Sequence, residues 1–71
     1  MTAKEMFEEL GYELIHNSEY QFEFYNEELD RYIWFYKNRK TFEAYDEINL
    51  TELKAIYKQV EELGWLEDVK D

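Results

Sequence analysis

The stretch RYIWFYKNRKTFEAY, Arg31–Tyr45, decides the fold, because it predicts two antiparallel strands around a polar Lys-Asn-Arg-Lys turn. Six of its fifteen residues are aromatic. Upstream, Tyr20–Tyr25 alternates aromatic and polar residues, a period of two that is typical of a half-buried strand. Tyr12–Asn17 is a candidate for a further strand. The middle of the chain therefore predicts an antiparallel sheet, a meander of hairpins with three or four strands.

The glutamates indicate which face of this sheet is buried. Glu23 and Glu43 occupy alternate positions on their strands, and a carboxylate is almost never fully buried without a partner. The intervening residues are therefore expected to face the core: Phe22, Phe24, Ile33, Phe35, Phe42 and Ala44. The strand 31–37 is apolar on both faces, and a slip of one residue would invert it, so its facing stays open.

A helix is predicted before the sheet, over residues 2–10. Thr2 and Glu5 have the spacing of a capping box, in which each side chain accepts a hydrogen bond from the other residue's backbone. Gly11 follows as a left-handed stop. The residues at helical spacing form one apolar face: Ala3, Met6, Phe7 and Leu10.

A second helix is predicted after the sheet, with Asn49 or Thr51 as its N-cap and Gly64 as its stop. Lys58 and Glu62 are spaced for an ion pair on its wet side. Its expected buried stripe consists of Leu53, Ile56, Tyr57, Val60 and Leu63.

The chain ends in two different kinds of segment. Residues 65–66, Trp-Leu, are expected to fold back onto the sheet or the first helix, and 67–71 to form a frayed, charged tail. Residues 1–71 then make a single α+β domain of order α-β-β-β-α, or α-β-β-β-β-α if residues 12–17 form a strand. Both helices are expected on one face of the sheet.

Composition predicts a folded, acidic protein. The 71 residues include 18 acidic and 8 basic ones, a net charge of −10, which repels nucleic acid and anionic membranes. An aromatic share of 20% distinguishes the chain from a disordered one. No apolar run approaches the ~18 residues of a membrane helix, and the first residues do not resemble a signal peptide. We therefore expect a cytoplasmic protein.

The residue pattern argues against catalysis, cofactors and metals. His16 and Ser18, the only residues of their types, lack a third orienting group and a glycine-rich oxyanion site. The loop 27–30 lacks the ligand spacing of a calcium loop, and the chain has no cysteine. No phosphate loop or dinucleotide fingerprint occurs. We expect no enzymatic activity, no cofactor, no metal site and no small-molecule ligand.

One basic cluster contains Lys37, Arg39 and Lys40. Cations beside aromatic residues are typical of single-stranded nucleic-acid binding, but the net charge opposes it. A soluble turn that protects the edge of a sheet explains the cluster more simply.

The outward rings of the predicted sheet are the strongest functional signal, because Tyr and Trp concentrate binding energy at interfaces. The candidate partner-binding residues are Tyr25, Tyr32, Trp34, Tyr36 and Tyr45, with Glu23 and Glu43. Two readings stay open. The rings either form a contact surface, or they are covered by cross-strand stacking or by the Trp-Leu segment 65–66.

Both ends of the chain resemble known proteins. TAKEMFEELGYE (2–13) and LTELKAIYKQVEELGWLE (50–67) are similar to small proteins encoded by phages and prophages of Gram-positive bacteria. That group has no assigned activity, so no site residues carry over. The resemblance implies expression in a bacterial cytoplasm during phage carriage or infection.

These observations predict a small, acidic, non-catalytic protein-interaction module. Its aromatic sheet face and acidic rim are expected to bind a basic host or phage protein, as an inhibitor or a nucleic-acid mimic. The alternative is a homodimeric structural domain that uses the same face on itself.

Overall fold

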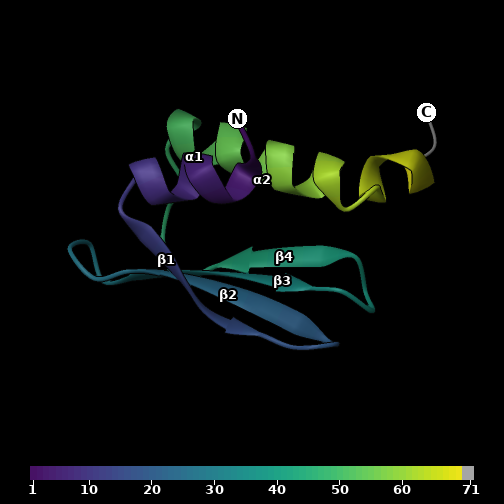
Figure 1. Ribbon diagram of the computed structural model, residues 1–71, viewed down its shortest axis with the longest axis horizontal. Helices are drawn as coiled ribbons and strands as arrows, with labels where there is room; N and C mark the ends of the chain where they lie inside the picture. The colour runs from purple at the N-terminus through teal and green to yellow at the C-terminus, as the bar shows by residue number, and fades with distance from the viewer. Residues whose placement is uncertain (70–71) are drawn as a thin grey trace.

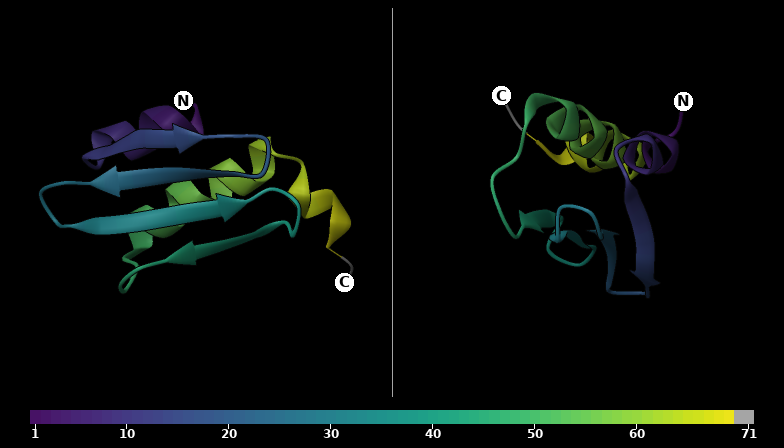
Figure 2. Two further views of the ribbon diagram at one scale, coloured as in Figure 1. Left: turned by 90° about the horizontal axis from the view of Figure 1, so that it is seen from below. Right: turned by 90° about the vertical axis from the view of Figure 1, so that its left-hand side faces the viewer.

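The protein is an α+β fold in which two helices cover one face of a four-stranded antiparallel sheet (Figure 1). The computed structural model describes residues 1–69, with α1 (Ala3–Glu9), β1 (Tyr12–Asn17), β2 (Gln21–Asn26), β3 (Arg31–Tyr36), β4 (Thr41–Ala44), α2 (Leu50–Glu62) and the 3-10 helix η1 (Trp65–Asp68). The strands pair in chain order as a meander (Figure 2). The predicted fold class is confirmed, and residues 12–17 supply the fourth strand.

Alternate residues of β2 and β3 face the helices and form an aromatic core. None of these four side chains is more than 6% exposed: Phe22, Phe24, Ile33 and Phe35. Phe7 of α1 stacks on Phe24 with ring centroids 4.3 Å apart, and Phe22 stacks on Phe35 at 4.8 Å. The facing of β3, which the sequence left open, is therefore settled with Ile33 and Phe35 inside.

Strand β4 is less enclosed because it has a neighbouring strand on one side only. Phe42 pairs with Phe35 and faces the same side, with ring centroids 6.1 Å apart, yet it is 45% exposed. Ala44 on the same face is half-buried. The predicted inward direction of Phe42 and Ala44 is correct, but the edge position leaves Phe42 open to solvent.

Both helices begin at capping boxes. Thr2 Oγ1 accepts a hydrogen bond from the Glu5 N–H at 3.1 Å, and Glu5 Oε1 accepts one from the Thr2 N–H at 2.8 Å. The hydrogen bond from the Thr2 N–H to the Glu5 carboxylate is the main cause that lowers the pKa of Glu5. Asn49 and Glu52 make the same reciprocal pair at the start of α2, so Asn49 is the cap. The expected left-handed stops follow the helices: Gly11 (φ 96°) and Gly64 (φ 77°).

The buried face of α2 is rotated from the predicted one. Ala55 and Ile56 are buried, whereas Leu53 and Tyr57 are 49% and 57% exposed. The prediction that Leu53 and Tyr57 belong to the buried stripe is therefore wrong. Because α2 packs against α1 as well as covering the sheet, its inward face includes Glu52 in place of these two residues.

The predicted Lys58–Glu62 pair is also replaced. Lys58 Nζ lies 3.3 Å from Glu61 Oε1, one residue earlier in the helix. Glu62 instead accepts a hydrogen bond from the backbone N–H of Ala3 at 2.8 Å. Packing of α1 beside α2 has redirected this carboxylate from the helix surface to the start of α1.

After α2 the chain turns back to the sheet. Trp65 is 8% exposed, and its ring centroid lies 6.3 Å from that of Phe35, as expected for a segment that folds back. A frayed tail was predicted for 67–71. Glu67 and Asp68 belong to η1, and Lys70 and Asp71 lie outside the described residues.

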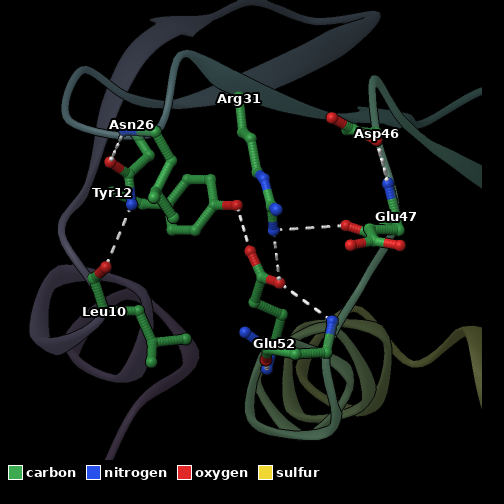
Figure 3. Close-up of polar contacts among 9 residues, drawn as sticks. Leu10, Tyr12, Asn26, Arg31, Asp46, Glu47 and Glu52 are labelled. Atoms are coloured by element: carbon green, nitrogen blue, oxygen red, sulfur yellow. Dashed lines mark hydrogen bonds and ion pairs between the residues drawn. The ribbon is translucent and has the colours of Figure 1, made fainter.

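A buried carboxylate connects α2 to the sheet (Figure 3). Glu52 is 1% exposed, and it accepts hydrogen bonds from the Tyr12 hydroxyl and the Asn49 N–H. Arg31 Nη1 lies 3.3 Å from Glu52 Oε1 and also donates to the Glu47 carbonyl. A buried charge is tolerated only with such partners. Burial, and then the hydrogen bond to Glu52, raise the pKa of Tyr12.

A buried amide closes the end of β2. Asn26 Nδ2 donates to the Leu10 carbonyl, and Asn26 Oδ1 accepts the Leu29 N–H, both at 3.0 Å (Figure 3 shows the first of these bonds). A Cβ atom at Gly11 would lie 3.1 Å from Asn26 Nδ2, which adds to the conformational need for glycine there. Asn26 is the last residue of β2, and its side chain connects this strand to the end of α1.

Candidate interaction surface

The predicted site residues lie together on one face of the sheet. Both helices cover the opposite face (Figure 1). Strand alternation places them opposite the buried phenylalanines. Tyr45, just beyond β4, joins them because its N–H donates to the Tyr32 carbonyl at 3.0 Å. We call this surface the aromatic face, and it consists of Tyr25, Tyr32, Trp34, Tyr36, Tyr45, Glu23 and Glu43.

The rings of the aromatic face contact one another, both within β3 and between β3 and its neighbours. The Tyr32 centroid lies 4.5 Å from Tyr25 and 5.5 Å from Trp34, whose ring plane is within 3° of parallel. Tyr45 meets Tyr32 edge-on at 6.4 Å. These contacts stabilise the sheet, but they cover each ring only in part. Tyr45 is 67% exposed, and the other four rings are half-buried.

The segment 65–66 does not cover this surface. Trp65 packs against Phe35, which belongs to the opposite face of the sheet. Of the two coverings considered from the sequence, cross-strand stacking is therefore present and covering by Trp65 is wrong. Part of each ring on the aromatic face is open to solvent.

Trp34 lies between two carboxylates. The strand register places Glu23 of β2 and Glu43 of β4 directly opposite it, one on each side. Glu43 Oε1 also accepts a hydrogen bond from the Tyr36 hydroxyl at 2.8 Å, which raises the pKa of Tyr36. An indole ring has a negative π face, so a ring flanked by two carboxylates is suited to a cation.

Arg39 shows such a contact within the protein. Its guanidinium carbon lies 4.6 Å from the centroid of the Tyr36 ring, and the same tyrosine is hydrogen-bonded to Glu43. A cation, an aromatic ring and a carboxylate thus already occur together at one end of the aromatic face.

Two further residues border the aromatic face. Glu13 pairs with Tyr25, and His16 pairs with Glu23. An irregularity between Leu14 and His16 shifts the register, so His16 shares a face with Glu13 although the two are three positions apart. The alternation of β1 signals Glu13, but nothing in the sequence marks the irregularity. Neither residue was among the predicted partner-binding residues. Glu13 adds a third carboxylate to the rim of the aromatic face.

The described residues offer little to other kinds of site. Ser18 Oγ donates a hydrogen bond to the Gln21 carbonyl and accepts one from the Tyr20 N–H, so its hydroxyl group stabilises the turn between β1 and β2. In residues 1–69 no group of three His, Cys, Asp or Glu side chains is placed to hold a metal ion. Within the same range, every helix is too short or too polar to cross a bilayer.

Comparison with known proteins adds no family to this picture. No protein-family model, no curated protein and no solved structure matches the chain. A functional assignment therefore rests on the residues and the geometry of the aromatic face.

Proposed function

We propose that the protein is a small, non-catalytic interaction module whose aromatic face binds a basic protein surface. The observation that carries the proposal is the cross-strand row Glu23, Trp34, Glu43. The ring and the two carboxylates all attract the same kind of group, an Arg or Lys side chain of the partner. The position of Arg39 on Tyr36, beside Glu43, supports this chemistry.

The charge of the whole chain supports a basic partner. A net charge of −10 steers the protein toward positive surfaces and away from nucleic acid. A basic surface that binds nucleic acid would attract the aromatic face for the same electrostatic reason, so the protein would act there as a competitive inhibitor. The resemblance to phage and prophage proteins favours a host or phage protein in a bacterial cytoplasm as the partner.

A homodimer through the same face is the competing assignment. A two-fold contact would bring two copies of the row Glu23, Trp34, Glu43 together, and like charges across an interface are unfavourable. We expect light scattering of the native chain to give a monomer mass over a wide concentration range. A dimer that Trp34→Thr converts to monomers would replace the proposal with self-association.

The direct test uses two small probes and two matched variants. N-acetylarginine amide carries the guanidinium group, and N-acetylcitrulline amide is its neutral analogue. Trp34→Thr removes the ring but keeps a good strand former, whereas Tyr57→Ala removes a 57% exposed ring from α2. Trp34→Glu is less suitable, because a third carboxylate between Glu23 and Glu43 would destabilise the sheet.

The measurement is the shift of backbone amide signals in NMR spectra. The arginine probe is expected to shift the signals of Glu23, Trp34 and Glu43 in the native chain and in Tyr57→Ala, but not in Trp34→Thr. The citrulline probe should leave them in place. Equal shifts from both probes, or shifts that persist in Trp34→Thr, would contradict the proposal.

A further inference from the structure

A pocket of about 310 Å³ lies on the helix side of the sheet, away from the aromatic face. Its apolar lining comes from β1, β2 and the end of α2: Leu14, Phe22, Phe24 and Leu63. A volume of this size is at the lower end of the range of ligand pockets, roughly 300–1,000 Å³. The sequence predicted no small-molecule ligand, because its residue pattern contains no ligand-binding motif.

Two lysines line the same pocket from different layers. Lys4 belongs to α1, and Lys37 follows β3. Lys37 Nζ is hydrogen-bonded to neutral oxygens, Asn17 Oδ1 at 3.1 Å and the Ser18 carbonyl at 2.7 Å. It also lies 5.5 Å from the Phe22 ring centroid. These contacts hold the ammonium group in place without neutralising its charge.

The carboxylate in the lining has a structural role of its own. Glu62 accepts the hydrogen bond from the Ala3 N–H at the start of α1. The charged part of the lining therefore contains two cations and one carboxylate, in a chain where acids outnumber bases by 18 to 8. The local balance is opposite to that of the whole protein, so this pocket is suited to an anion.

We propose that this pocket binds a small amphipathic carboxylate of the medium-chain fatty-acid class. The alkyl chain packs against the side chains of Leu14, Phe22 and Leu63, and the carboxylate lies near the ammonium groups of Lys4 and Lys37. Apolar burial supplies most of the affinity, and the lysines select the charged head group. This activity is independent of the proposed protein contact, because the two surfaces are on opposite faces of the sheet.

The test titrates the native chain with octanoate, octan-1-ol and acetate, and follows backbone amide signals by NMR. Octanoate is expected to shift the signals of Leu14, Phe22 and Leu63 saturably. Octan-1-ol, which has the chain without the charge, should bind at least about fivefold more weakly. Acetate, which has the charge without the chain, should cause no saturable shift.

Matched charge-reversal variants make the test specific. Lys4 and Lys54 are both exposed helix residues, but only Lys4 lines the pocket. Lys4→Glu is expected to weaken octanoate binding at least about fivefold, and Lys54→Glu to change it less than twofold. Equal affinity for octanoate and octan-1-ol, absence of saturable shifts, or equal effects of the two variants would overturn the proposal. The arginine probe, read at Trp34, reports on the aromatic face separately.

Discussion

The two faces of the sheet are built from alternate residues of the same strands, yet they carry different rings. The inner face of β2 and β3 has phenylalanines that are at most 6% exposed. The outer face has tyrosines and a tryptophan that are half-buried. Phenylalanine has no polar atom to satisfy, whereas Tyr and Trp carry a polar atom suited to contact with water. The inner face therefore builds the core, whereas the outer face keeps the partly exposed rings on which the proposed protein contact depends.

The largest expected effect is a loss of unfolding free energy, and it should differ between two adjacent residues of β3. Phe35 is fully buried, so Phe35→Ala should reduce the free energy of unfolding by about 3–5 kcal/mol. The total free energy of unfolding of a small domain is little larger than this loss, so the Phe35→Ala variant should be largely unfolded. Trp34→Thr should cost only about 1 kcal/mol, as the loss of cross-strand contacts. Urea unfolding followed by circular dichroism measures both. Similar losses would mean that the aromatic face belongs to the core.

A smaller effect is expected for Glu→Gln substitutions, which we compare on the helix side of the sheet and on the aromatic face. Glu52→Gln leaves the partly buried Arg31 without its counter-charge, and should reduce the free energy of unfolding by about 2–3 kcal/mol. Glu43→Gln on the aromatic face should change it by less than about 0.5 kcal/mol. Thermal and urea unfolding would check both values. A neutral Glu52→Gln would show that hydrogen bonding, and not charge, holds α2 in place.

The smallest effect is the alkaline loss of stability. The folded state keeps the proton of Tyr12 above the ordinary tyrosine pKa of ~10, since burial and then the hydrogen bond to Glu52 raise its pKa. The stabilisation that comes from the protonated Tyr12 is complete below pH ~10. It is lost as the pH rises further, because the unfolded chain then releases the proton first. At neutral pH, Tyr12→Phe should cost about 1 kcal/mol.

The matched control for that prediction is Tyr36→Phe on the aromatic face. Its pKa is also raised, through the hydrogen bond to Glu43, but its side chain is only half-buried. Tyr12→Phe should therefore flatten the decline of stability above pH ~10 more than Tyr36→Phe does. Urea unfolding at a series of alkaline pH values measures the two slopes. Equal slopes would place the titrating proton elsewhere in the protein.

Local patterns were sufficient to predict most of the fold. Strand alternation and helix capping depend on residues within a few positions, so Glu23 and Glu43 identified the outer face, and Thr2 with Glu5 identified the start of α1. The same alternation is sufficient to place all seven residues of the aromatic face on one side of the sheet. What this surface binds remains a proposal, because strand geometry contains no information about a partner.

The errors come from contacts between distant segments. Glu52 is buried because Tyr12, 40 positions away, and Arg31, 21 positions away, provide its hydrogen bonds. The exposure of Tyr57 depends on where α1 packs beside α2. The pocket is likewise formed by residues of α1, α2, β1, β2 and the turn after β3. Sequence periodicity describes one element at a time, so it could not reveal these features.

The hydrogen bond between Ala3 and Glu62 has a consequence for folding during synthesis. It joins residues 59 positions apart and accompanies the packing of α1 on α2. The hairpins can close as soon as neighbouring strands are made, but α1 has seven residues, fewer than the roughly 12–15 that an isolated helix needs. Helix α1 can therefore become stable only after α2 has been synthesised. Until α2 has left the ribosome, Phe24 and Phe35 have no complete helical cover, and a chaperone could bind them in that interval.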